Sequence, residues 1–228
     1  GQSGADLSAV PGLDLFIDSD VPVGVGLGSS AALETAVAVA LNDAWQLSLD
    51  SMSLAKVSQR AENSVVGKET GLSDHIPSLL GEDHRAVLFD SRSLDSDQVS
   101  FPLSERGLSL LVIDTGIERA TDLGAERFSE REEASDAVKI SSLRELSPKS
   151  LPEYREALSP VTYRRAQHIV NENQRVLDAA KALRTEGPES LGEILSASQA
   201  SLRDDYDASG KEIDLAVETC LAQGAYGA

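Results

Sequence analysis

The stretch PVGVGLGSSAALETA, residues 22–36, places three glycines and two serines in seven positions and then continues into an alanine-rich apolar run. Closely spaced glycines cost backbone entropy, but they remove the Cβ atoms that keep a ligand away from the main chain. A helix that begins at such a loop offers free N–H groups and the positive end of its dipole, which together bind anions. The sequence therefore predicts a phosphate-binding loop formed by Gly24, Val25, Gly26, Leu27, Gly28, Ser29 and Ser30.

Two well-known phosphate loops do not fit this stretch. The Walker A pattern requires Lys-Ser or Lys-Thr after its last glycine, and G-x-G-x-x-G requires a glycine where Ser29 stands. The alternative is a glycine-rich turn that is merely capped by Ser29 or Ser30. A strand expected over 13–24 and a buried helix expected over 31–45 favour the anion site, because a loop between a strand and a helix provides the required geometry.

Hydrophobic periodicity predicts a mixed first half and a helical second half. We expect a helix over 53–66 with an apolar side made of Leu54, Val57, Ala61 and Val65. A turn between Gly67 and Gly71 then leads to a short helix over 75–80. Strands over 84–90, 98–103 and 108–115 follow closely enough to be antiparallel neighbours. Charged amphipathic helices fill the rest, and a lobe boundary is expected between Thr115 and Thr121.

The composition excludes several classes of function. A net charge of −18 over 228 residues argues against binding to nucleic acid or to an anionic membrane surface. No apolar run reaches transmembrane length, and residues 1–10 lack the basic and apolar regions of a signal peptide. Cys220 is the only cysteine, so an internal disulfide is impossible. We expect a cytoplasmic protein.

Several segments resemble the GHMP kinases, and among them the galactokinases. VPVGVGLGSSAALETA (21–36) is similar to the motif P-x-G-x-G-L-x-S-S-A-A, which closes over the phosphates of ATP. AENSVVGKETGLSDH (61–75) resembles A-E-N-x-x-V-G-x-x-x-G-[IL]-M-D-Q, and residues 164–183 and 195–228 resemble the C-terminal lobe of that family. The resemblance begins at about Leu13 and keeps the order of the family's motifs.

This resemblance implies a fold and an activity. The fold would be α+β and two-lobed, with an N-terminal lobe over 1–116 like domain 2 of ribosomal protein S5 and a mostly helical, ferredoxin-like C-terminal lobe over 117–228. Both lobes would be incomplete at the chain ends. The activity would be ATP-dependent phosphorylation of galactose at its anomeric hydroxyl, giving galactose 1-phosphate in the Leloir pathway. Small-molecule substrates and a monomer are expected.

The resemblance also assigns roles to single residues. Asp74 corresponds to the carboxylate that acts as base or orienter for the sugar hydroxyl, although an aspartate before a short helix can also be only an N-cap. Gly71 corresponds to a glycine whose backbone approaches the sugar. Ser30 and Glu62 correspond to positions associated with Mg²⁺, and the alternative for Glu62 is a solvated helix charge. A structural role is expected for the remaining candidates, namely His75, His84, His168 and the RDDYD run (203–207).

Four features depart from the family pattern. No R-x-x-x-I-G-E-H-x-D-Y segment is found near the start, and the chain stops at GAYGA, before the motif G-A-R-x-T-G-G-G-F-G-G. Gly124 stands where the family has a sugar-contacting tyrosine. Ser73-Asp74-His75 replaces Met-Asp-Gln, and Gly28 replaces a serine.

These departures leave three interpretations open. The first is an internal piece of a galactokinase, whose activity as given is expected to be impaired. The second is a galactokinase-like protein that binds sugar or nucleotide without turnover. The third is a GHMP kinase that acts on another sugar, which the changes at Gly124 and His75 make conceivable.

Overall fold

The computed structural model describes residues 11–67, 70–117 and 123–228, with side chains from residue 126 onward in the last range. Its internal contacts divide the chain into two compact units, Gly1–Val99 and Ser100–Ala228. Each unit is described by itself below, as unit 1 and unit 2. The lobes expected over 1–116 and 117–228 stay a prediction.

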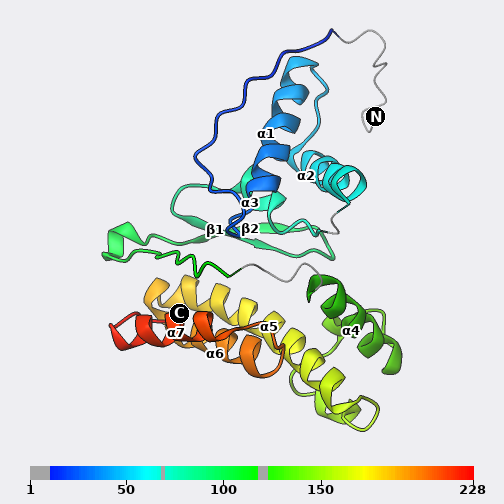
Figure 1. Ribbon diagram of the computed structural model, residues 1–228, viewed down its shortest axis with the longest axis vertical. Helices are drawn as coiled ribbons and strands as arrows, with labels where there is room; N and C mark the ends of the chain where they lie inside the picture. Colours follow the sequence, from blue (N-terminus) through cyan, green and yellow to red (C-terminus); the bar gives the residue numbers. More distant parts are fainter. Residues whose placement is uncertain (1–10, 68–69, 118–122) are drawn as a thin grey trace. The chain divides into compact units, whose positions relative to one another are not determined.

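Unit 1 is built on three helices that pack against one another. They are α1 (Ser29–Ala44), α2 (Ser51–Ala61) and α3 (His75–Leu80), and each contacts the other two (Figure 1). Asp50 caps α2 by accepting a hydrogen bond from the Ser53 amide at 2.7 Å. The buried apolar residues of these helices are few, namely Ala31, Leu54, Ala55 and Ile76. The core of unit 1 is therefore small.

The expected helix over 53–66 ends in a π-helical turn, η2 (Glu62–Val66), in which the Gly67 amide bonds to the Glu62 carbonyl at 3.1 Å. A π turn inserts one residue into the helical register, so the side chains after it no longer follow the apolar face. Glu62 is only 3% exposed, whereas Val65 is 84% exposed. The prediction that Val65 belongs to the apolar side is therefore wrong, and so is the alternative of a solvated charge at Glu62.

Two of the four expected strands are present in the described residues. Strand β1 (Arg85–Phe89) pairs with β2 (Ser96–Ser100) in a two-stranded sheet. The Asp90 amide bonds to the Asp95 carbonyl at 2.9 Å and closes the turn between them. A connection this short joins antiparallel strands, as predicted. The second strand begins at Ser96 rather than at Gln98.

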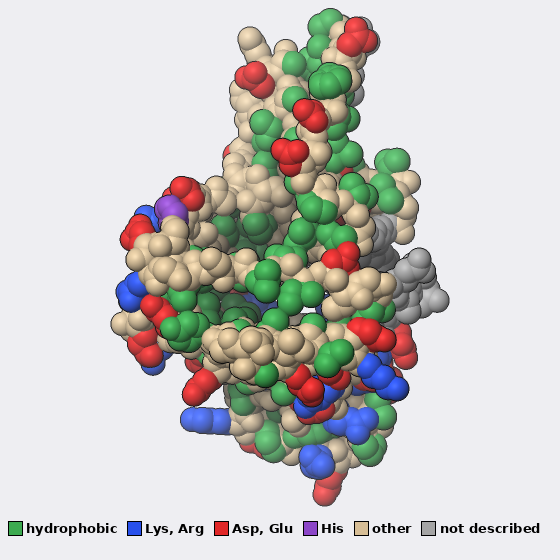
Figure 2. Space-filling view, turned by 60° about the vertical axis from the view of Figure 1, so that its left-hand side comes forward, with side chains coloured by type: hydrophobic (Ala, Val, Ile, Leu, Met, Phe, Trp, Pro, Cys, Tyr) green, Lys and Arg blue, Asp and Glu red, His purple; other side chains and the backbone are tan. Residues whose placement is uncertain are grey.

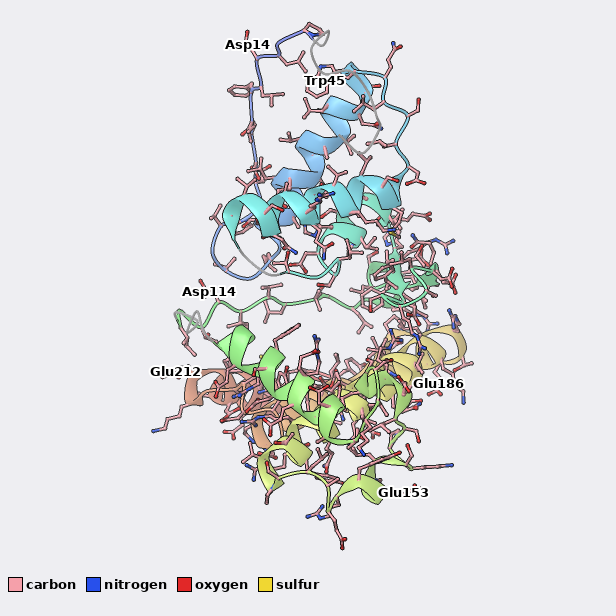
Figure 3. The ribbon with its side chains drawn as sticks, turned by 90° about the vertical axis from the view of Figure 1, so that its right-hand side faces the viewer. Asp14, Trp45, Asp114, Glu153, Glu186 and Glu212 are labelled. Carbon is pink, nitrogen blue, oxygen red and sulfur yellow. The ribbon has the colours of Figure 1, made fainter. Side chains whose placement is uncertain are left out.

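The strands predicted over 13–24 and 108–115 are wrong. Both segments run as coil and form no strand (Figure 1). Their apolar side chains are exposed, with Phe16 at 94% and Leu110 at 73%. An extended segment becomes a strand only when its N–H and C=O groups pair with a neighbour. Among the described residues neither segment has such a neighbour. Figure 3 labels Asp14 and Asp114, which stand on these two segments.

The prediction of a fully buried helix over 31–45 is also wrong. In α1 only Ala31 and Thr35 are buried, whereas Leu33 and Val39 are each 44% exposed. The reason is that α2 and α3 cover one side of α1, and the segment 13–24 forms no strand that could cover another. Figure 2 accordingly shows hydrophobic side chains among polar ones at the surface.

Unit 2 is mostly helical, as expected. It contains α4 (Leu123–Ala137), α5 (Pro160–Thr185), α6 (Leu191–Asp204) and α7 (Lys211–Ala222), and short 3-10 turns over Ser104–Arg106, Leu143–Glu145, Leu151–Tyr154 and Pro188–Ser190. Helix α5 packs against α4 and α6. Ser159 caps α5 by accepting from the Thr162 amide at 3.0 Å, and Pro160 occupies the first turn, where its missing N–H costs nothing.

The apolar core of unit 2 lies around α4, α5 and the turns that connect them. Its members are Ala134, Val138, Leu143, Leu146, Leu151, Leu158, Tyr163, Ala166 and Val170. Within the described ranges, no helix of either unit is long and apolar enough to cross a membrane.

The RDDYD run holds unit 2 together through buried arginines. Arg165 is 5% exposed, and it donates to the Asp205 carbonyl at 2.7 Å, to the Asp207 carboxylate at 3.3 Å and to Glu130 at 3.1 Å. Arg127 donates to the same Glu130 carboxylate at 2.8 Å. The geometry supports the structural interpretation of this run, because its acids and carbonyls satisfy buried donors.

Candidate functional site

The glycine loop contains three residues in the left-handed region of φ. Gly24, Gly26 and Gly28 have φ angles of +84°, +80° and +69°, and they alternate with Val25 and Leu27. Left-handed residues alternating with ordinary ones turn successive N–H groups toward one concave side, where an anion can bind. The loop residues 24–27 are exposed, so packed side chains do not cover them.

Helix α1 begins directly at the end of this loop. Its N-cap is Gly28, which has no side chain, and no side-chain hydrogen bond caps the helix. The interpretation of a turn capped by Ser29 or Ser30 is therefore wrong, because both serines lie inside the first helical turn. The first amides of a helix have no acceptor within it, so here they are available to a ligand together with the positive end of the dipole.

Asp74 lies beside the end of the loop. A Cβ atom built on Gly28 would be 3.5 Å from the Cβ of Asp74 and 3.7 Å from its Oδ2, so the Asp74 side chain covers the Gly28 Cα. Asp74 occupies the N-cap position of α3, but its side chain accepts no capping hydrogen bond. Ser78 donates only to the Asp74 backbone carbonyl, at 3.0 Å. The side chain is exposed, so its carboxylate can meet a ligand at the loop.

Ser30 and Glu62, which the family resemblance associates with Mg²⁺, are in contact. The Ser30 hydroxyl donates to Glu62 Oε1 at 2.8 Å. Thr70 donates to the other carboxylate oxygen, Oε2, at 2.7 Å. Thr70 is itself fixed, because its amide bonds to Asn63 Oδ1 at 3.1 Å and its carbonyl accepts from Gln59 at 2.8 Å. The π turn and the following loop thus hold Glu62 toward the start of α1.

Two further side chains complete this cluster. On α1, the Oε1 atom of Glu34 lies 3.3 Å from the hydroxyl oxygen of Ser30. The Nε2 atom of His75 lies 3.1 Å from Glu34 Oε2 and 3.8 Å from Glu62 Oε2. His75 is 1% exposed. Ligand atoms of Glu34, Glu62 and His75 all lie within 4.8 Å of one another, close enough to share one metal ion. We call these residues, with Ser30, the Glu-His cluster.

The residues that remain from the sequence analysis do not belong to the Glu-His cluster. Gly71 is exposed, and a Cβ atom built on it meets nothing within 4 Å, so the space beside its backbone is open. Gly124 lies in α4, at a position whose surroundings lie outside the described residues. His84 is exposed, and His168 belongs to unit 2.

Sequence reasoning missed Glu34, Thr70 and the placement of His75. Glu34 follows Ser30 by one helical turn, and residues four apart lie on the same helix face, so this pair could have been found from the sequence. The approach of Glu62 and His75 to that face could not, because it depends on the π turn and on the packing of α3 against α1 and α2.

The chain resembles known kinases in sequence. The family description "GHMP kinases N terminal domain" matches residues 2–82. The galactokinase of Mycobacterium tuberculosis strain H37Rv is 38% identical over 222 residues, which are 96% of this chain and 61% of that protein. The galactokinase of Streptomyces coelicolor is 37% identical over 221 residues, covering 95% of this chain and 57% of its own length. The chain thus spans about three fifths of these relatives.

The fold is also similar to that of a solved kinase. The crystal structure of Lactococcus lactis galactokinase complexed with galactose matches with a TM-score of 0.81 and 32% sequence identity. The match covers 91% of this chain and 55% of that one. The similarity therefore extends over both sequence and fold, along nearly the whole of the chain.

Proposed function

We propose that the chain serves as a galactokinase, because residues 2–82 match the N-terminal domain of the GHMP kinases and nearly the whole chain aligns with galactokinases. The reaction would transfer the γ-phosphoryl group of ATP to the anomeric hydroxyl of galactose. The observation that supports this proposal most is the approach of Asp74 to Gly28, since it brings a carboxylate beside the glycine loop that we propose holds phosphate.

The loop would hold the phosphates of ATP. Its three left-handed glycines and the free amides at the start of α1 present several N–H donors to one anion. Phosphoryl transfer requires little covalent help, so fixing the phosphates in place and neutralising their charge provide most of the catalysis. Ser29 and Ser30 would add hydroxyl donors at the same end of the helix.

The donor set near Ser30 fits a Mg²⁺ ion that accompanies ATP. Mg²⁺ prefers hard oxygen ligands, and it is usually held by one or two carboxylates together with phosphates and water. Ser30 and Glu62 supply a hydroxyl and a buried carboxylate 2.8 Å apart at the base of the loop. When bound there, Mg²⁺ would offset negative charge on the phosphates during transfer.

Asp74 would accept a proton from the sugar. As the anomeric oxygen forms its bond to the γ-phosphorus, the bond from that phosphorus to the oxygen that leaves with ADP breaks. The hydroxyl proton passes to the Asp74 carboxylate and then to solvent. Two features suit Asp74 to this role, its exposed side chain and the lack of a capping hydrogen bond. Gly71 would let the sugar approach the backbone, because the space beside it is open.

The proposal also includes the lobe boundaries, the oligomeric state, the location and the substrates that the family resemblance implies. The N-terminal lobe would extend over 1–116 and the helical C-terminal lobe over 117–228, and the working unit would be a monomer in the cytoplasm. ATP and galactose would be its small-molecule partners.

The proposal is tested with a panel of sugars and ATP, using the protein expressed from its complete reading frame. The assay measures ADP release and sugar phosphate together. We expect galactose to be the preferred acceptor. Preference for another sugar would instead support a GHMP kinase of different specificity, and saturable ATP and galactose binding without product would support a non-catalytic binding protein.

A further inference from the structure

We propose that His75 and Glu34 are ligands of the divalent cation in this site, and that the nitrogen of His75 makes the site prefer Mn²⁺ or Co²⁺ to Mg²⁺. The inference rests on the proposed function only in that the same cation would accompany ATP. It departs from the structural role that the sequence suggested for His75, and it adds a nitrogen donor where galactokinases usually have glutamine.

The spacing of the polar atoms suits a metal ion. Metal–ligand bonds of about 2.1 Å place neighbouring ligand atoms roughly 3.0–3.4 Å apart in octahedral or tetrahedral geometry. Ser30 Oγ lies 2.8 Å from Glu62 and 3.3 Å from Glu34, and His75 Nε2 lies 3.1 Å from Glu34. The separation between His75 Nε2 and Glu62 Oε2 is 3.8 Å, so a small movement brings all four groups around one ion.

The imidazole of His75 makes its polar contacts with the carboxylates of this cluster. His75 is 1% exposed, and among the described residues the only polar contacts of its ring run from Nε2 to the two carboxylates. Its other nitrogen, Nδ1, is buried without a hydrogen-bond partner. A buried polar ring is normally satisfied at both nitrogens, so the fold orients His75 toward Glu34 and Glu62 at a cost. That cost is understandable if Nε2 binds a ligand there.

The ligand types decide which ion is preferred. Carboxylate and hydroxyl oxygens suit Mg²⁺ and Mn²⁺ alike, whereas an imidazole nitrogen adds affinity for transition metals and little for Mg²⁺. Two carboxylates that lie this close also favour a divalent ion, because it offsets their mutual repulsion. The cluster therefore matches a hexacoordinate transition metal such as Mn²⁺ or Co²⁺, with positions left for phosphate and water.

The test uses Co²⁺ and Mn²⁺ as probes, in the absence of ATP and sugar. Co²⁺ binding is followed by its visible absorption, and Mn²⁺ binding by the electron spin-echo modulation that a coordinated imidazole nitrogen produces. We expect the wild-type protein to show nitrogen modulation. His75→Gln should lose it and should weaken Co²⁺ binding at least tenfold, while Mg²⁺ affinity changes less than threefold.

The matched control is His84→Gln, which changes an exposed histidine of the same unit and should leave both signals unchanged. Should His75→Gln fail to fold, the spin-echo modulation is compared between unlabelled wild-type protein and wild-type protein labelled with ¹⁵N-histidine, which needs no substitution. Modulation that is absent in the wild type, or that persists in folded His75→Gln, overturns the proposal. Nitrogen coordination in a protein that phosphorylates no sugar would leave this inference standing and refute the proposed function instead.

Discussion

The side chain of Asp74 lies against the Cα of Gly28, where a Cβ atom would be 3.5 Å from the Cβ of Asp74. Gly28 is both the last left-handed residue of the glycine loop and the N-cap of α1. The contact therefore joins the two parts of the proposed site, the loop amides that would hold phosphate and the carboxylate that would activate an acceptor hydroxyl. The φ angle of +69° at position 28 favours glycine there, since L side chains rarely adopt this backbone conformation.

Replacing Asp74 tests the proposed base. We expect Asp74→Asn to lower kcat with galactose by about 10²–10⁴-fold, because a general base contributes an effect of that size. ATP affinity should stay nearly unchanged, since the amide keeps the shape of the side chain. Asp83→Asn, an exposed acid of the same unit, is the control and should retain full turnover. Full activity in Asp74→Asn would remove Asp74 from the mechanism.

Replacing Gly28 tests the loop. Gly28→Ala forces a Cβ atom onto a residue with φ of +69°, and should destabilise the protein by about 1–2 kcal/mol. It should also weaken ATP binding, because relief of the strain moves the loop amides. Gly107→Ala, at φ +67° in unit 2, carries similar backbone strain and has open space around it. If both variants lose ATP affinity equally in isothermal titration, the loop has no special role.

Replacing Ser30 tests its part in cation binding. Ser30→Ala removes the hydroxyl that lies 2.8 Å from Glu62, and should raise the Mg²⁺ concentration for half-maximal activity roughly tenfold. Ser30→Thr keeps the hydroxyl and should restore most of the response. An unchanged Mg²⁺ dependence in Ser30→Ala would show that the hydroxyl does not contribute.

Replacing Arg165 tests the structural role assigned to the RDDYD run. Arg165→Ala removes one of the two buried arginines that donate to Glu130 and the donor to the Asp205 carbonyl, and should cost about 3–5 kcal/mol in the free energy of unfolding. Arg164→Ala changes the exposed neighbour and should stay within about 0.5 kcal/mol. Urea titrations measure both, and equal losses would contradict the assignment.

His168 should make unit 2 less stable in mild acid. Burial lowers the pKa of His168 below 6.5, and the ring hydrogen-bonds Ser201 Oγ at 3.0 Å and stacks on Tyr206. Below pH 6.5 the unfolded chain then binds a proton that the folded unit does not, so stability falls as the pH drops from 6.5 toward the folded pKa. Above pH 6.5 this contribution is fully present. An NMR titration should give a midpoint below 6.5, and a midpoint above it would contradict the assignment.

The elements that were predicted correctly are those with local signals. The short helix expected over 75–80 is α3, and the positive φ angles of Gly24, Gly26 and Gly28 agree with the conformational freedom expected of the glycines in this loop. The segments 13–24 and 108–115 failed because an apolar alternating pattern makes a strand only when another strand pairs with it. Glu62 was assigned through resemblance alone, since its burial depends on a π turn that no periodicity reveals.

The proposed kinase activity depends on the loop amides binding the phosphates of ATP, and backbone amide NMR tests this most directly. The ¹⁵N-labelled protein is titrated with Mg²⁺ and a nonhydrolysable ATP analogue, and the amides of Gly26, Gly28 and Ser29 are followed. We predict large, saturable downfield shifts at these amides, with a common dissociation constant. Saturable binding of the analogue that leaves these amides unmoved would contradict the account.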